Sequence, residues 1–258
     1  MNTLKELYQY REMIFSLIRK DLRGRYKGSA LGFFWTFLNP LLQLVVYTVV
    51  FSWLFPNNIE KFYIFLFVGL VPWLFFNTSL VGGATSVVSQ ENLIKKIYFP
   101  RQVLPIAYVT SAFVNMLFTF LVIFAVLIFS GYGVNLKIMW ALPIVMFVEY
   151  LFALGIALIT SALTVYLRDL EYILGILAMA WMYLTPILYE VTMIPEQFRH
   201  LIYWNPMTGI ILCYKELLYY KRLPELGDLS ATFCIGVAFM LIGFVVFQKM
   251  QKRFVEEM

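Results

Sequence analysis

Three basic residues, Arg23, Arg25 and Lys27, lie close together in the stretch DLRGRYKGSALG at residues 21–32. Cationic side chains at this spacing are suited to binding the oxygen atoms of a phosphate group. A simpler role fits the same charges, because lysine and arginine beside an apolar segment fix its orientation in a membrane. The sequence therefore predicts either a phosphate-binding segment or a topology signal here.

A single carboxylate, Glu149, interrupts a long apolar stretch and is followed by Tyr150. An ionisable group at membrane depth is costly, so it is expected to face protein or water. Two roles fit this position: lining a substrate path, or forming a hydrogen-bonded contact between helices. Glu149 and Tyr150 are therefore candidate channel-lining residues.

The residues that enzymes and metal sites use are scarce in this chain. His200 is the sole histidine, and the two cysteines, Cys213 and Cys234, lack metal-ligand neighbours. The sequence contains no GxxxxGK[ST], GxSxG or HExxH motif. We therefore predict no catalytic residue, no metal site and no cofactor bound by this chain.

The composition is that of a membrane protein. Of the 258 residues, 62% are hydrophobic and 14% are charged, whereas soluble domains have roughly 45–50% apolar and about 25% charged residues. The basic residues behind the net charge of +5 lie beside apolar stretches. Orientation and lipid headgroups explain them better than binding to nucleic acid does.

Six apolar windows are long enough to cross a bilayer, which takes about 20 helical residues. Each is expected to be helical, because lipid offers the backbone amides no hydrogen-bond partner. We predict an all-α integral membrane protein with one membrane domain over residues 1–258. The six predicted transmembrane helices lie within residues 28–59, 62–90, 102–136, 138–167, 172–189 and 229–248.

Two further elements flank these spans. Residues 4–22 alternate apolar side chains at spacings of three and four with charges, which predicts an N-terminal amphipathic helix at the membrane interface. Residues 200–214, bracketed by Arg199 and Lys215, are apolar but too short to span. They contain Asn205-Pro206, and we predict a re-entrant extracellular hairpin before the last span.

The loop between the second and third spans is predicted to form a short helix. Residues 89–91 resemble a helix start, with a polar side-chain cap followed by an acid in the first turn. Lys95 and Lys96 come next, and Pro100 ends the helix. Such a helix suits docking of a soluble partner, and an inert connection is the alternative. The candidate docking residues are Ser89, Gln90, Glu91, Asn92, Leu93, Ile94, Lys95 and Lys96.

The distribution of charge predicts the orientation. With six spans and both termini in the cytoplasm, most of the 20 basic residues fall in cytoplasmic segments, as the positive-inside rule requires. A seventh span at residues 200–214 would move the basic C-terminal end outside, which the same rule disfavours.

Three stretches together resemble the permease subunits of ABC exporters for polysaccharides, O-antigens and teichoic acids. They are LIRKDLRGRYKGSALGFFWTFLNPLL at 17–42, KKIYFPRQVLP at 95–105 and YWNPMTGII at 203–211. The resemblance extends over essentially the whole chain. It implies a transport subunit rather than an enzyme, working as a permease homodimer with two copies of a separate ABC ATPase that binds ATP and Mg²⁺.

The resemblance also implies a substrate and roles for the candidate residues. The substrate would be a glycan or polyol-phosphate polymer on undecaprenyl pyrophosphate, exported across the cytoplasmic membrane of a bacterium. The N-terminal helix and the loop helix would contact the ATPase, and Arg23, Arg25 and Lys27 would receive the pyrophosphate. Glu149 matches no motif of the family. Two alternatives remain: an ABC permease for a hydrophobic drug or lipid, and a membrane-embedded glycan-modifying enzyme.

Overall fold

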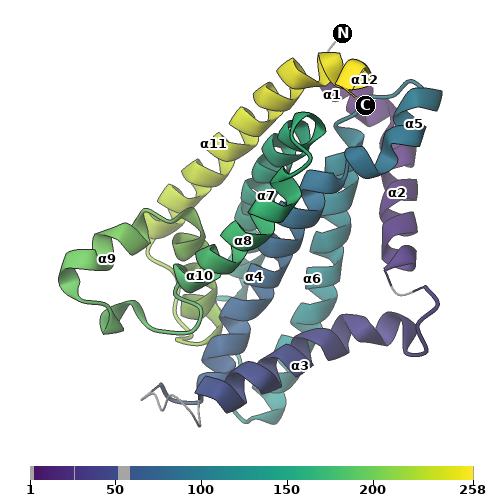
Figure 1. Cartoon of the computed structure of the whole chain (residues 1–258). Helices are drawn as coiled ribbons and strands as arrows, with labels where there is room; N and C mark the ends of the chain where they lie inside the picture. Colours follow the sequence, from purple (N-terminus) through teal and green to yellow (C-terminus); the bar gives the residue numbers. More distant parts are fainter. Residues whose placement is uncertain (1–2, 26, 52–58, 258) are drawn as a thin grey trace.

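The computed structural model describes residues 3–257 except 26 and 52–58, and throughout this part the regular elements are helices (Figure 1). The end of the first predicted span, at 52–58, lies outside the described residues. Five helices of the described part are long and apolar enough to cross a membrane. They are Gly32–Val49 (η1, Gly32–Phe34, with α3, Trp35–Val49), Phe62–Thr85 (α4), Val103–Phe129 (α6), Met139–Tyr166 (η4, Met139–Ala141, with α7, Leu142–Tyr166) and Leu226–Arg253 (α11, Leu226–Met250, with η6, Gln251–Arg253).

The sixth predicted window, 172–189, contains a shorter helix than expected. Helix α8 (Leu170–Tyr183) has 14 residues, about 21 Å at 1.5 Å per residue, against a hydrocarbon thickness of roughly 30 Å. It ends before Pro186, because proline lacks an amide hydrogen and disfavours helical backbone at the residue before it. The described part thus has five long spans and one shorter apolar helix, and the sixth crossing stays a prediction.

Helix α4 is the central element of the fold. It packs against α3, α6, α7, α8 and α10 (Pro206–Leu218), and most of its residues are buried. A helix that is apolar all round is expected in such a position. Aromatic contacts hold it there: the ring of Phe76 stacks on Phe152 with centroids 5.4 Å apart and meets Trp181 edge-on at 5.0 Å.

Glycines let α7 and α11 approach each other closely. A Cβ atom added to Gly243 would collide with the carbonyl oxygen of Gly155, and one added to Gly155 would collide with the backbone of Phe239 and Met240. Lipid supplies no hydrophobic drive between helices, so association depends on van der Waals contact, which small residues bring within range. This contact fixes how α11 lies along the bundle.

The N-terminal segment forms two helices, α1 (Thr3–Gln9) and α2 (Arg11–Gly24), separated at Tyr10. The single helix predicted over residues 4–22 is therefore two consecutive helices with a break at Tyr10. Helix α2 runs alongside the first half of α6 (Figure 1). Just before α2, the Tyr10 hydroxyl donates to the carbonyl of Tyr98, in the loop that precedes α6, at 3.2 Å. The placement of this N-terminal segment at a membrane interface stays a prediction.

The predicted hairpin is a pair of helices, α9 (Glu196–Tyr203) and α10, joined at Trp204 and Asn205. Helix α9 has no buried residue, whereas most of α10 is buried against α4, α7 and α11. The Asn205 side chain caps α10 by accepting from the Met207 amide at 3.0 Å, and it also accepts from the Trp181 indole at 2.7 Å. The two helices thus meet at Asn205, inside the predicted hairpin, and the re-entrant placement stays a prediction.

We expect Gly243→Ala to destabilise the protein, because the added methyl group pushes α11 away from Gly155. Overpacking of this kind costs about 1–3 kcal/mol, which lowers the melting temperature by more than about 2 °C. The matched control is Gly227→Ala on the same helix, where an added Cβ meets nothing within 4 Å. Thermal unfolding of the two detergent-purified variants measures the difference, and equal melting temperatures would contradict a close α7–α11 contact.

Candidate functional site

The predicted phosphate-binding segment lines a cavity of about 670 Å³ between the end of α2, the end of α4 and the start of α6. We call this cavity the cationic pocket. Four basic side chains line it against one acid, Asp21. The basic residues are Lys20, Arg23, Arg25 and Lys27. Lys20 is absent from the predicted set, although its place three residues before Arg23 on one helix puts both on the same face.

The basic residues of the cationic pocket differ in how they are held. Arg25 pairs with Asp21 at 2.9 Å and donates to the Ser111 hydroxyl at 3.2 Å, so its charge is shared with an acid and ties the end of α2 to α6. Arg23 and Lys27 are exposed, and neither has an acidic partner among the residues that the structure describes. An anion entering the cationic pocket therefore meets Arg23 and Lys27 as uncompensated charges.

The predicted docking segment shares a wall with the cationic pocket. Ser89 and Gln90, in η3 (Val88–Gln90), line the pocket together with Ser86 at the end of α4. The fold thus brings together two candidate groups that lie far apart in the sequence. A phosphate group in this pocket would touch the base of the docking segment.

The short helix predicted in this loop is confirmed as α5 (Glu91–Lys96). Glu91 and Lys95 form an ion pair of 2.6 Å across one turn, and this hydrogen bond from Lys95 holds the pKa of the Glu91 carboxyl below its usual range. The expected side-chain cap is wrong: the Ser89 hydroxyl donates to the Ser86 carbonyl at 3.3 Å instead.

The outer surface of this loop carries apolar side chains. Ile94 is buried and anchors α5, and Leu93 is half-buried, whereas Asn92 and Lys96 are exposed. Beyond the helix, Ile97 is 49% exposed and Tyr98 is 85% exposed. The loop therefore leaves two apolar side chains uncovered beside the exposed charge of Lys96.

Glu149 and Tyr150 point to different helices. Glu149 is fully buried on α7 and accepts a hydrogen bond of 2.6 Å from the Tyr214 hydroxyl of α10. The hydroxyl of Tyr150 bonds to that of Thr110 on α6 at 2.8 Å. Both residues thus connect helices of this chain, and their role in lining a channel stays a prediction.

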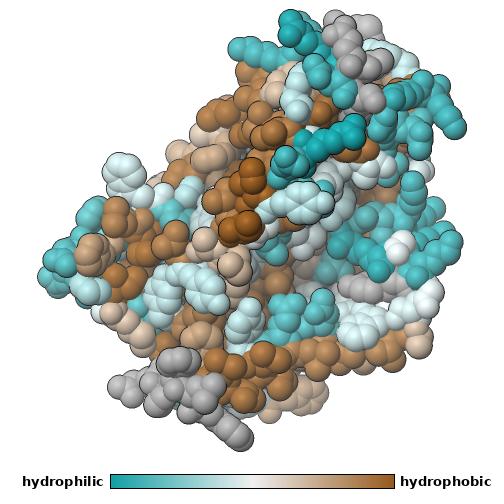
Figure 2. All heavy atoms as spheres, in the orientation of Figure 1, coloured by the Kyte–Doolittle hydropathy of each residue, from teal (hydrophilic) through white to brown (hydrophobic). Residues whose placement is uncertain are grey.

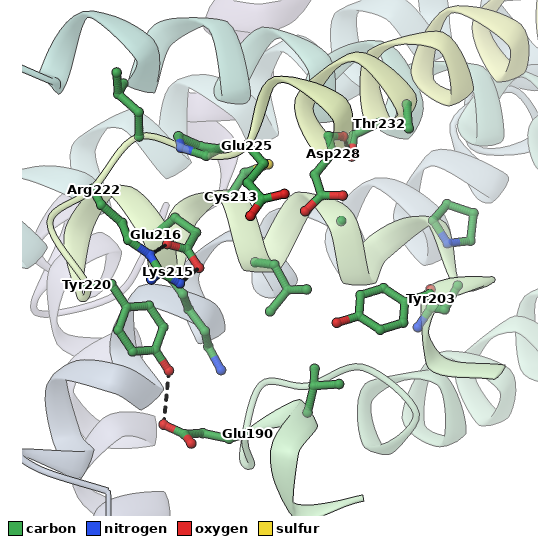
Figure 3. A pocket seen from close by; sticks show the side chains of 18 of the residues that line it. Glu190, Tyr203, Cys213, Lys215, Glu216, Tyr220, Arg222, Glu225, Asp228 and Thr232 are labelled. Atoms are coloured by element: carbon green, nitrogen blue, oxygen red, sulfur yellow. Dashed lines mark hydrogen bonds and ion pairs between the residues drawn. The ribbon is translucent and has the colours of Figure 1, made fainter. Parts of the chain in front are cut away.

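A second large cavity, of about 740 Å³, lies at the other end of the bundle, between the α9–α10 pair, residues 189–192 and the start of α11 (Figure 3). Its wall carries carboxylates and tyrosine rings, including Tyr203 and Asp228. The Tyr220 hydroxyl donates to Glu190 at 2.9 Å. We call this second cavity the outer cavity. Its residues come from four separate segments, so no local spacing in the sequence indicates it.

Lys215, which lines this cavity, is buried. The sequence alone suggests instead a charged residue that marks the end of the predicted hairpin. The Nζ atom of Lys215 donates to the carbonyl oxygens of Pro186 at 2.5 Å and Ile187 at 3.2 Å, and it lies 3.3 Å from the centre of the Phe65 ring. Lys215 therefore supplies the hydrogen bonds that the backbone lacks where α8 ends.

Comparison of the sequence with known proteins identifies the family of this chain. The model of the ABC-2 type transporter family matches residues 12–219. The chain is 34% identical over 258 residues to the O-antigen export system permease protein RfbA of Myxococcus xanthus, covering 98% of each chain. It is 34% identical over 245 residues to RfbA of Klebsiella pneumoniae, covering 95% of this chain and 94% of the relative. It is 20% identical over 237 residues to the polysialic acid transport protein KpsM of Escherichia coli, covering 90% of this chain and 91% of the relative. The protein therefore belongs to the ABC-2 type transporter family.

Proposed function

We propose that this chain is the membrane permease of an ATP-driven exporter that moves a polysaccharide linked to undecaprenyl pyrophosphate across the cytoplasmic membrane of a bacterium. The observation that carries the proposal is the cationic pocket, whose wall contains both Arg23 and Ser89. The relatives named for O-antigen export and polysialic acid transport support the class of substrate.

The pocket suits the pyrophosphate of such a carrier. Charge-assisted hydrogen bonds from arginine and lysine are the strong contacts that proteins make with phosphate oxygens. Arg23 and Lys27 supply this charge without an acidic partner in the described part. A permease for a neutral drug has no use for four basic residues around one cavity, so the alternative substrate that fits best is an anionic lipid.

The loop with α5 suits the docking of a separate ABC ATPase, which would bind ATP and Mg²⁺. Because the basic and apolar side chains of this loop are exposed, a soluble partner has a surface to cover. Helices α1 and α12 (Phe254–Glu257) lie at the same end of the molecule as α5 (Figure 1). Both described ends of the chain thus lie at the end of the molecule where the ATPase would dock, which supports termini in the cytoplasm. By analogy with the family, two permeases would pair as a homodimer with two copies of the ATPase.

Replacing Arg23 and Lys27 with glutamine should reduce export about tenfold or more, since two charged contacts to the pyrophosphate are lost. The Arg25–Asp21 pair is left intact, so the fold should be retained. The readout is cell-surface polysaccharide in the native bacterium, with protein level and orientation measured alongside.

The control for these two charges is the double variant Lys249→Gln and Lys252→Gln. It removes the same number of exposed charges at the C-terminal end of α11, outside the cationic pocket. Normal export by the Arg23 and Lys27 variant would mean that these residues serve orientation only. Equal loss in both double variants would have the same meaning.

The combined variant Lys96→Glu and Tyr98→Ala should weaken ATPase association about tenfold, the scale expected for a buried aromatic residue at an interface. Tyr98 is 85% exposed in the permease alone, so its side chain contributes little to the fold. Co-purification of the ATPase measures the effect. Leu136→Ala is the control, because Leu136 is 82% exposed in a different loop. Undiminished recovery of the complex would exclude this loop as the docking surface.

A further inference from the structure

A third cavity, of about 260 Å³, lies between α3, α4 and α6 and is lined largely by uncharged polar side chains. We call it the amide groove. In Figure 2, hydrophilic atoms lie directly above the apolar edge that α3 forms along the bottom of the view. The polar residues that define the groove are Thr36, Asn39, Gln43, Asn77, Asn115 and Thr119.

These residues lie inside three of the five long apolar helices. Amide side chains in such helices are costly unless they find partners, and they commonly mark a substrate path. Their spacing is regular: Thr36, Asn39 and Gln43 follow at three and four residues on α3, and Asn115 and Thr119 are four apart on α6. Each helix therefore presents one polar face to the same groove.

Three of the six side chains that define the amide groove have no hydrogen-bond partner in the described part of the chain, and the Thr119 hydroxyl donates to the Asn115 carbonyl at 3.1 Å. Thr36 is only 1% exposed, and the Thr36 hydroxyl has no hydrogen-bond partner in the described part of the chain. Gln43 donates to Asn39 at 3.1 Å, but no hydrogen bond joins Asn77 or Asn115 side chains to other described residues. Polar residues that only join membrane helices bond across them. Here donors and acceptors are left for a ligand.

The amide groove adjoins the cationic pocket. Arg25 lines both cavities, so its side chain forms part of the wall between them. A ligand whose phosphate lies in the cationic pocket would place its next group at the amide groove. The groove carries neutral donors and acceptors, which match the hydroxyl groups of a sugar. Its volume is below the roughly 300–1,000 Å³ of sites for drug-sized ligands, which suits a single ring.

We propose that the amide groove binds the sugar next to the phosphate of the lipid-linked glycan and discriminates between glycans by their hydroxyl pattern. This inference rests on the proposed function, because it assumes that the cationic pocket receives the phosphate. Amide side chains discriminate well, since a sugar lacking a matching hydroxyl would leave an amide unpaired once the ligand covers the groove.

The test compares two probes on the full-length permease in lipid nanodiscs: lipid-linked glycan isolated from the source bacterium, and undecaprenyl pyrophosphate without sugar. The wild type should bind the glycan probe more tightly. The double variant Asn77→Leu and Asn115→Leu should lose roughly tenfold in affinity for the glycan probe. Its affinity for the bare probe should stay unchanged, which also reports that the variant is folded.

The matched control is Leu117→Ala, because Leu117 is 40% exposed and lies about 200° around α6 from Asn115. The inference is overturned if the double leucine variant binds the glycan probe like the wild type, or if it loses both probes equally. The proposed function fails separately: the Arg23 and Lys27 variant would then bind the bare probe as well as the wild type does.

Discussion

Backbone polar groups in an apolar environment have no water to bind, and the end of α8 shows what this constraint demands. Pro186 stops the helix and leaves carbonyl groups without helical partners. Lys215 donates to the carbonyls of Pro186 and Ile187, and Asn205 donates to the Thr185 hydroxyl at 2.9 Å. These bonds hold α10 against the broken end of α8, so the α9–α10 pair and the outer cavity depend on them. Irregular backbone at such a position is tolerated only because protein encloses it.

Helix α4 connects the two functional ends of the molecule. Its last turn leads to Ser86 and the cationic pocket, and Phe65 near its first turn meets Lys215. Between these ends, α4 is packed on most sides, with Phe76 held between Phe152 and Trp181. Close-packed interiors are weakly compressible and transmit displacement. Helix α4 is therefore a rigid connection between the cationic pocket and the helices that wall the outer cavity.

The polar groups of the bundle are ordered by charge. The uncompensated positive charges lie in the cationic pocket. Arg25, which is paired with Asp21, lies at the boundary between this pocket and the amide groove. The neutral amide side chains follow in the groove, between α3, α4 and α6. This order matches a substrate whose phosphate is strongly anionic and whose sugars are neutral and hydrated. Between α3, α4 and α6 this order also limits the burial of charge, since the polar residues that line the amide groove beyond Arg25 are neutral.

The sequence by itself determined the features that depend on neighbouring residues. Apolar length and turn signals correctly predicted the helical class, five of the six long apolar helices and α5, because these are local properties of the chain. The helix at the sixth predicted span, α8, has only 14 residues, since Pro186 lies within an apolar window whose composition hides the end of the helix. Only the tertiary structure brought Ser89 to Arg25, joined Glu149 to Tyr214 across 65 residues and gathered the amide groove from three helices. The reason is that such contacts depend on how each helix is rotated and how closely it packs. Contacts such as Gly155 against Gly243 decide this, and the periodicity of a single sequence does not specify it.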